Sequence, residues 1–238
     1  MDNPVLHFLC IHYTTISPQD REYLFSLLSY TEKHQYNTLQ SDSKKAEFLV
    51  SRCALKALAK LTGFETLHYN FATKKTLHNK QPLYISLSHT HSAVAVSLSY
   101  TPHGIDIEPY TRHVAYRNAI IQRYFAPSEH QYINHLPWGK TKRFLHLWTL
   151  KEAIAKSQEL SLTHALEYDT VTNPNELLLA NFFVWKKYIC GIAIGDSYCE
   201  KILIRQYTMD GNELAGFLCG CGRYRIRTSD LLHVRQAL

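Results

Sequence analysis

The sequence between residues 104 and 108 is GIDIE and is followed by Pro109. Isoleucine at every second position predicts a short strand that the proline ends, because side chains alternate between the two faces of a strand. Ile105 and Ile107 therefore point to one face, and Asp106 and Glu108 share the other. An isolated pair of this kind is more often a solvated strand edge. Beside buried isoleucines, however, two carboxylates repel each other strongly unless a cation lies between them.

A second motif lies on a helix that we expect over residues 140–156. Trp148, Glu152 and Lys156 are spaced four apart, so they line one face of that helix. A Glu–Lys pair at this spacing is usually a surface ion pair. Tryptophan is mostly buried, so its place on this face indicates that Glu152 and Lys156 point into a cleft. Oxygen donors without nearby His or Cys favour Mg²⁺ over zinc.

The rest of the chain alternates helices and strands. One helix is expected to begin at Ser17-Pro18, a second to cover residues 41–61 and stop at Gly63, and another to begin near Pro127. Strands are expected over residues 5–13, 83–87, 93–98, 181–186, 188–195 and 201–207, with a turn over residues 88–92.

This order predicts an α+β fold. Both parts of the chain run from helices to a closing hairpin, which favours two similar α/β halves in a pseudo-twofold arrangement with a seam near Gly104. We expect an N-terminal half over residues 1–103 and a C-terminal half with the acidic motifs over residues 104–220. Residues 221–238 do not continue the strand pattern and are expected to form a flexible basic tail.

Composition limits the classes of function. The chain has 238 residues, of which 45% are hydrophobic and 19% charged, as in a globular protein. Its net charge is +6, and the four arginines from Arg223 onward, less Asp230, supply +3 of it. The rest is mildly basic, which suits an anionic small molecule or an acidic protein, and we expect no nucleic-acid partner. No apolar run approaches the ~20 residues of a membrane span, and we expect no membrane partner and a cytoplasmic location.

The two motifs together resemble a known family. GIDIE at residues 104–108, followed by Trp148-x-x-Lys151-Glu152-Ala153-x-x-Lys156, is similar to the paired motifs of the 4′-phosphopantetheinyl transferase superfamily. The length resembles the long, two-halved, monomeric (surfactin-synthetase-activating) class. Segments 48–56, 86–89 and 125–129 also resemble motifs of that family. The family's Gly-Lys-Pro is Asn79-Lys80-Gln81-Pro82 here, and its early Gly-Arg is Ser51-Arg52.

The resemblance implies an activity and a site at the seam between the halves. The enzyme would be a holo-[acyl-carrier-protein] synthase that moves 4′-phosphopantetheine from coenzyme A to a serine of an apo acyl or peptidyl carrier protein and releases 3′,5′-ADP. Mg²⁺ would be held by Asp106, Glu108 and Glu152. Glu152 would also act as the base, directly or through a metal-bound water, and Lys156 would steady the leaving group.

The resemblance also implies the surfaces that bind the two substrates. Residues 111–124 would form the loop that meets the carrier protein. Coenzyme A would contact Lys44, Arg52, Lys56, Lys80, Ser88, His89 and Lys151. Lys56 stands where the family commonly has arginine, and lysine keeps the charge but loses bidentate phosphate geometry.

Two other functions are compatible with acidic residues near a lysine. A Mg²⁺-dependent nuclease commonly places Asp and then Glu-x-Lys within one strand, whereas Lys156 follows Glu152 by four residues on a helix. A catalytically inactive carrier-binding module would keep the fold but need not keep the acids. Plasmid cleavage identifies the first, and tight binding of coenzyme A without turnover identifies the second.

Overall fold

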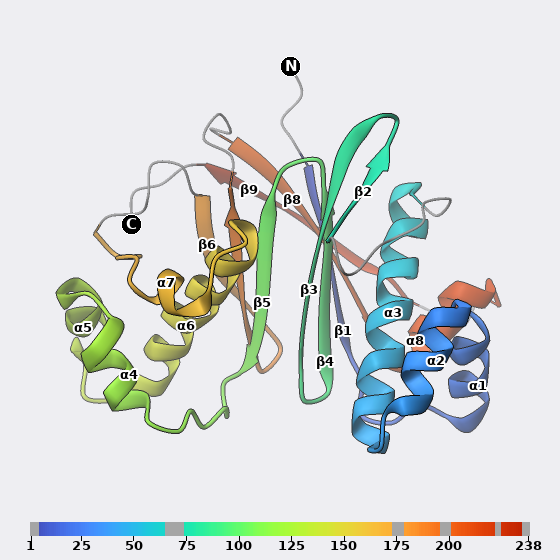
Figure 1. Cartoon of the computed structure of the whole chain (residues 1–238), viewed down its shortest axis with the longest axis horizontal. Helices are drawn as coiled ribbons and strands as arrows, with labels where there is room; N and C mark the ends of the chain where they lie inside the picture. The colour runs from blue at the N-terminus through green and yellow to red at the C-terminus, as the bar shows by residue number, and fades with distance from the viewer. Residues whose placement is uncertain (1–4, 65–73, 173–178, 196–200, 222–224, 235–238) are drawn as a thin grey trace. The chain divides into compact units, whose positions relative to one another are not determined.

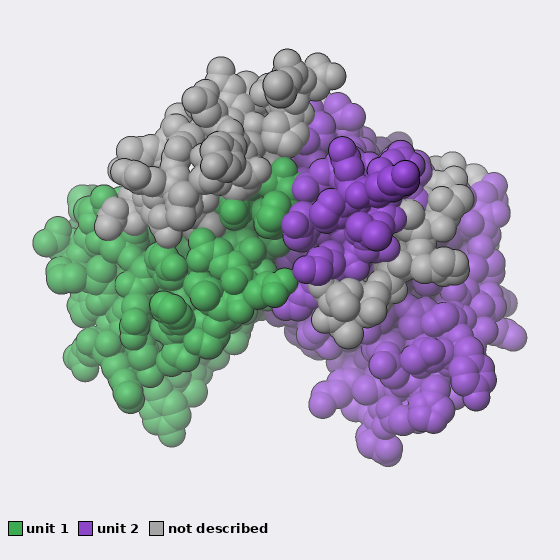
Figure 2. Space-filling view, turned by 45° about the horizontal axis from the view of Figure 1, so that its top comes forward, with its two compact units in different colours: residues 1–4, 101–202, 233–238 green, residues 5–100, 203–232 purple. Residues whose placement is uncertain are grey.

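The computed structural model describes residues 5–64, 74–172, 179–195, 201–221 and 225–234 (Figure 1). The chain divides into two compact units (Figure 2). Unit 1 comprises residues 1–4, 101–202 and 233–238, and unit 2 comprises residues 5–100 and 203–232. Both units combine helices with a β-sheet, which agrees with the predicted α+β class. Among the helices described, none is long and apolar enough to cross a membrane.

Unit 2 contains a six-stranded sheet in the order β2-β3-β4-β1-β8-β9. Strand β1 lies near its middle, antiparallel to β4 and parallel to β8. The strands are β1 (Val5–His12), β2 (Lys75–His78), β3 (Gln81–Thr90), β4 (Ala93–Ser99), β8 (Lys201–Asp210) and β9 (Arg227–Val234).

Helix α1 begins, and helix α3 ends, at the caps that the sequence predicts. Ser17 caps α1, accepting a hydrogen bond from the Asp20 amide, and Pro18 is the first helical residue. The long helix α3 ends at Gly63, whose φ of 78° is a left-handed conformation that favours glycine. The apolar face of α3 packs into the core with residues of β1 and β4. The helices are α1 (Pro18–Ser26), α2 (Tyr30–Thr38), α3 (Asp42–Thr62) and α8 (Gly211–Cys219).

Unit 1 contains a three-stranded antiparallel sheet in the order β5-β7-β6. The hairpin between β6 and β7 closes at the pair Trp185 and Tyr188, near the predicted position. The elements are β5 (His103–Pro109), β6 (Leu179–Trp185), β7 (Tyr188–Ile194), α4 (Arg117–Tyr124), α5 (Pro127–Asn134), α6 (Lys140–Ser157) and α7 (Leu162–Leu166).

Two expectations about local structure were wrong. Strand β3 continues to Thr90, because it stays paired with β4 up to Ala93, so the turn is confined to His91 and Ser92. Residues Arg227–Val234 form strand β9, which pairs with β8 at the sheet edge, although no strand was predicted there. Both differences come from pairing with another strand, which local sequence does not specify.

The boundary between the units also differs from the expected one at residue 220. Strand β8 lies parallel to β1, and the contacts place residues 203–232 in unit 2 with the start of the chain. The two sheets have different numbers of strands, so the similarity of two halves stays a prediction.

Candidate functional site

Two glycines allow helix α6 to lie directly against strands β5 and β7. A Cβ atom at Gly104 would lie 2.0 Å from the carbonyl oxygen of Ala153, and one at Gly191 would lie 2.5 Å from that of Thr149. Any side chain at either position would therefore collide with the helix backbone. This close packing brings α6 against the strand that carries Asp106.

Three carboxylates meet where α6 crosses β5. Oxygen atoms of Asp106 and Glu108, from β5, and of Glu152, from α6, all lie within 4.8 Å of one another. Asp106 is 2% exposed and Glu108 is 5% exposed. The predicted sharing of one strand face by the two acids is therefore observed, and the helix adds the third acid.

Two basic side chains contact this acidic trio of Asp106, Glu108 and Glu152. Lys156 Nζ lies 2.8 Å from Asp106 Oδ1 and donates to it. Arg112 forms an ion pair with Glu108, and its guanidinium lies 5.7 Å from the centre of the Trp148 ring. Two cations against three carboxylates leave the site with a net negative charge if all the acids are ionised.

The neighbouring carboxylates and burial change the pKa of Glu152. Burial and then repulsion from Asp106 raise that pKa to about 7, although Lys156, Arg112 and the Trp148 indole act in the opposite direction. In the metal-free arrangement Glu152 therefore holds its proton to a much higher pH than an isolated carboxyl group does.

The donor set fits a hard divalent cation. Three carboxylates converge without a histidine or cysteine among them, which is the ligand chemistry that Mg²⁺ and Mn²⁺ prefer. A cation would also offset the repulsion that raises the Glu152 pKa. Asp106, Glu108 and Glu152 are thus the residues that would hold it.

Lys151, expected to contact coenzyme A, lies in the protein interior instead. Its side chain is fully buried, and its ammonium lies 2.9 Å from Glu129 Oε1. It also donates to the carbonyl oxygens of Leu166 and Tyr168. These three acceptors match the three N–H donors of an ammonium, which leaves none for a phosphate. The physical reason is the helix geometry, because successive residues of a helix are about 100° apart, so Lys151 points away from the face that holds Glu152 and Lys156.

The other expected coenzyme A contacts lie in unit 2. Arg52 and Lys56, both on α3, approach the same carboxylate of Glu32 on α2, at 3.7 and 3.4 Å. His89 Nδ1 lies 3.2 Å from Glu47 Oε1 of α3. The structure thus places Arg52, Lys56 and His89 beside two acids of the same unit.

The remaining three expected contacts differ in exposure. Lys44, in the first turn of α3, and Lys80, in the tight turn between β2 and β3, are exposed. Ser88 is 6% exposed within β3. Lys80 adopts a φ of 67°, which belongs to the turn type that closes two-residue hairpins.

Sequence reasoning missed several partners of the predicted residues. The position of Glu32 could have been predicted from the sequence, because Ser29 and Glu32 form a capping box that begins α2. Arg112 follows Glu108 by four residues outside any helix, so no periodic pattern indicated their ion pair. Glu47 stands in the second turn of α3, and only the pairing of distant segments brings His89 to it.

The comparison with known families concerns the part of the chain that carries the trio. No curated protein matches the sequence. Residues 102–187, which include β5, α6 and all three carboxylates, match the model of the 4′-phosphopantetheinyl transferase superfamily. The matched segment covers 86 of the 238 residues, so it is this part of the chain that is similar to the superfamily.

Proposed function

We propose that the protein transfers 4′-phosphopantetheine from coenzyme A to a serine of an apo acyl or peptidyl carrier protein and releases 3′,5′-ADP. The observation that carries this proposal is the meeting of Asp106, Glu108 and Glu152 within 4.8 Å, inside the segment that matches the superfamily. We further propose that the protein is a cytoplasmic monomer of the long, two-halved class.

The reaction is a displacement at phosphorus. The serine oxygen forms a bond to the phosphorus that carries pantetheine, and the bond from that phosphorus to the 3′,5′-ADP oxygen breaks. The bridging oxygen leaves with the electron pair, and the serine proton must go to a base. A divalent cation bound by the trio supplies Lewis-acid stabilisation of the pyrophosphate charge.

The side chains of unit 1 then have separate tasks. Asp106 and Glu108 lie on a strand that α6 covers, so they serve as rigid ligands. Glu152 lies on the helix face beside them and is the candidate base for the serine proton. Lys156 extends along the same face and would steady the leaving 3′,5′-ADP, as Arg112 would steady Glu108.

The substrate surfaces follow the same proposal. Residues 111–124, which follow the strand that carries Asp106 and Glu108, would meet the carrier protein. Lys44, Arg52, Lys56, Lys80, Ser88 and His89 of unit 2 remain the proposed contacts for coenzyme A. We do not propose Lys151 as a contact, because its ammonium is buried against Glu129.

The experiment is mass spectrometry of several apo-carriers incubated with coenzyme A and Mg²⁺. A carrier that gains the phosphopantetheine mass supports the proposal, and Asp106→Ala or Glu152→Ala should abolish the gain while circular dichroism shows a folded protein. Glu167→Ala is the matched control, because Glu167 is an exposed acid of unit 1. Full activity of both site variants would overturn the roles proposed for the trio. Plasmid cleavage with no transfer would favour a nuclease.

A further inference from the structure

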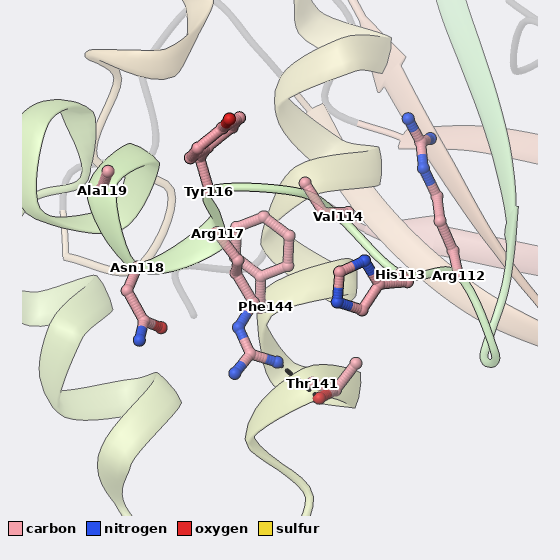
Figure 3. A pocket seen from close by; sticks show the side chains of 9 residues that line it. All are labelled: Arg112, His113, Val114, Tyr116, Arg117, Asn118, Ala119, Thr141 and Phe144. Atoms are coloured by element: carbon pink, nitrogen blue, oxygen red, sulfur yellow. Dashed lines mark hydrogen bonds between the residues drawn. The ribbon is translucent and has the colours of Figure 1, made fainter.

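A pocket of about 500 Å³ in unit 1 belongs to the surface proposed for the carrier protein (Figure 3). Most of its lining residues fall within residues 111–124, and Arg117 of that segment donates to Thr141 Oγ1 at 2.6 Å. A group of side chains that the proposed function does not use lies in unit 2, where helix α8 ends.

The cysteines that the structure describes differ sharply in exposure. Cys10, Cys53 and Cys190 are buried, whereas Cys219 and Cys221 are exposed. Burial raises the pKa of the Cys53 thiol to about 12, and a thiol of that kind does not react as a thiolate at neutral pH. Reagents dissolved in water therefore reach the two exposed thiols before the buried ones.

Cys219 and Cys221 are separated by the glycine that ends α8. Gly220 has a φ of 69°, a left-handed conformation that favours glycine. Cα atoms that are two residues apart can be at most about 7 Å apart, and a turn at the residue between them shortens that distance. Disulfides usually join Cα atoms that are roughly 4.4–6.8 Å apart. The backbone at this helix end is therefore compatible with a bond between the two sulfurs.

Both thiols contact the same atom. Cys219 Sγ lies 3.3 Å from the carbonyl oxygen of Gly216, and Cys221 Sγ lies 3.6 Å from it. The amide of Cys221 also donates to that oxygen, at 3.3 Å. A carbonyl oxygen has two lone pairs, so three donors compete for it. Cys219 and Cys221 thus form a dithiol whose sulfurs lie on the same side of the chain, and a disulfide would leave the oxygen to the amide.

Two other side chains of unit 2 lie beside this dithiol. Lys60 of α3 donates to the carbonyl oxygens of Phe217 and Leu218 at 3.2 and 3.4 Å. Its charge offsets the negative end of the helix dipole, which would otherwise disfavour a thiolate. The pKa of Tyr23 is raised, first by burial and then by the two thiols of the dithiol. The Tyr23 hydroxyl therefore lies near both sulfurs, which agrees with their contact with one carbonyl oxygen.

We propose that the dithiol is a redox modification site, which a small-molecule disulfide oxidises to an intramolecular disulfide bond. One thiolate of the protein attacks a sulfur of the small disulfide, forms a mixed disulfide and releases the first small thiol. The second thiolate then attacks the protein sulfur of the mixed disulfide and releases the second small thiol. The dithiol loses two electrons and two protons, and the reagent gains them as it is reduced to two thiols.

Incubation of the full-length protein with glutathione disulfide, followed by mass spectrometry of tryptic fragments, tests the proposal. Both cysteines of the dithiol fall in the fragment 206–223, because no Lys or Arg stands between Arg205 and Arg223. We expect this fragment to become two hydrogen atoms lighter and to carry no glutathione, while Cys10 and Cys53 stay reduced. A fragment that does not react, or that keeps glutathione on both thiols, would overturn the proposal.

Single variants separate the two steps. Cys221→Ser removes the second thiol, so glutathione should stay on Cys219 as a stable mixed disulfide. Cys219→Ser should give the matching adduct on Cys221. A variant without any adduct would contradict the proposed exchange, because the remaining thiol is still exposed.

The unaltered protein in concentrated urea is the control for the fold, because it keeps the Cys-Gly-Cys sequence but loses the turn and the shared carbonyl oxygen. We expect the folded protein to close the internal disulfide at a severalfold lower ratio of glutathione disulfide to glutathione than the unfolded chain. An equal ratio for the two states would show that the end of α8 contributes nothing to the reaction, and would overturn the structural assignment.

Discussion

Lys156 Nζ lies 2.8 Å from Asp106 Oδ1 and 3.0 Å from the carbonyl oxygen of Ile105. The lysine at the end of α6 is therefore tied to the strand that carries two of the three carboxylates. This contact explains how a 2% exposed aspartate is tolerated beside Glu152, because a positive charge stands next to it.

Replacing this lysine should make stability depend on a divalent cation. Lys156→Met leaves Asp106 without its counter-ion, and we expect a loss of about 1–3 kcal/mol in the free energy of unfolding in chelator. Mg²⁺ should restore part of that loss, because it supplies positive charge to the same carboxylates and binds only the folded state. Urea unfolding with and without Mg²⁺ measures both effects.

Lys140→Met is the control for that measurement, because Lys140 is an exposed lysine at the other end of the same helix. It should change stability little in either buffer. An equal loss in the two lysine variants would show that the ion pair of Lys156 with Asp106 contributes nothing specific.

The contact between α6 and β5 should not tolerate a side chain on the strand. Gly104→Ala places a methyl group 2.0 Å from the Ala153 carbonyl oxygen, so the helix must move away. We expect a loss of about 3 kcal/mol in unfolding free energy and weaker cation binding, since Glu152 moves with the helix. Gly195→Ala is the control, because its methyl group would lie 3.3 Å from the Ser157 carbonyl oxygen, a tight contact that a shift of a few tenths of an ångström relieves. Thermal unfolding of both variants measures the loss of stability, and a Mg²⁺ titration of both measures cation binding. Normal cation binding by Gly104→Ala would contradict the packing argument.

Substitutions of the buried pair Glu129 and Lys151 should have coupled effects on the free energy of unfolding. Lys151→Met leaves the carboxylate of Glu129 buried without its cation, and such a change costs about 3–5 kcal/mol. Glu129 keeps two hydrogen bonds from Thr170, through the amide at 3.1 Å and the hydroxyl at 2.7 Å, so the remaining charge stays in place. The double variant Lys151→Met/Glu129→Gln should recover much of the loss.

A double-mutant cycle by urea unfolding tests this coupling. If Lys151 bound coenzyme A instead, the single variant would lose coenzyme A affinity at unchanged stability. That result would return Lys151 to the set of ligand contacts.

Asp169 should make stability sensitive to acid. Its burial raises its pKa, but hydrogen bonds from Thr172, Ser128 and Val171 outweigh that effect and lower the pKa to about 2. A carboxylate whose pKa is lower in the folded state stabilises that state above its unfolded pKa of about 3.8 and loses this contribution as the pH falls toward 2. Asp169→Asn should therefore destabilise the protein at neutral pH, and the difference from the unaltered protein should shrink as the pH falls.

Chemical denaturation over a series of pH values checks this expectation. Glu167→Gln is the matched control, because Glu167 is an exposed acid nearby in the sequence. A difference for Asp169→Asn that stays constant down to acidic pH would show that its ionised form contributes no stability.

Local pattern was sufficient for several elements of both units. Alternation in residues 104–108 predicted a strand with both acids on one face, and four-residue spacing placed Glu152 and Lys156 on one helix face. The caps at Ser17 and Gly63 set helix ends where they were expected. These features depend on residues within a few positions of each other, which is the range that backbone geometry controls.

The long-range pairings were not predictable in this way. Strand β8 lies parallel to β1 from the start of the chain, and β9 extends the same sheet. Pairing between distant segments depends on the whole packed core, so neither the place of residues 203–232 nor strand β9 followed from the local pattern.

The sequence by itself determined which acids face the same way and which helix face carries Glu152, because side-chain direction follows from strand and helix geometry. Only the tertiary structure decided that these groups meet within 4.8 Å, since that depends on glycines at positions 104 and 191 letting a helix backbone touch the sheet. The same packing turned Lys151 toward Glu129 and away from any ligand, because a neighbour of Glu152 on a helix must point in another direction.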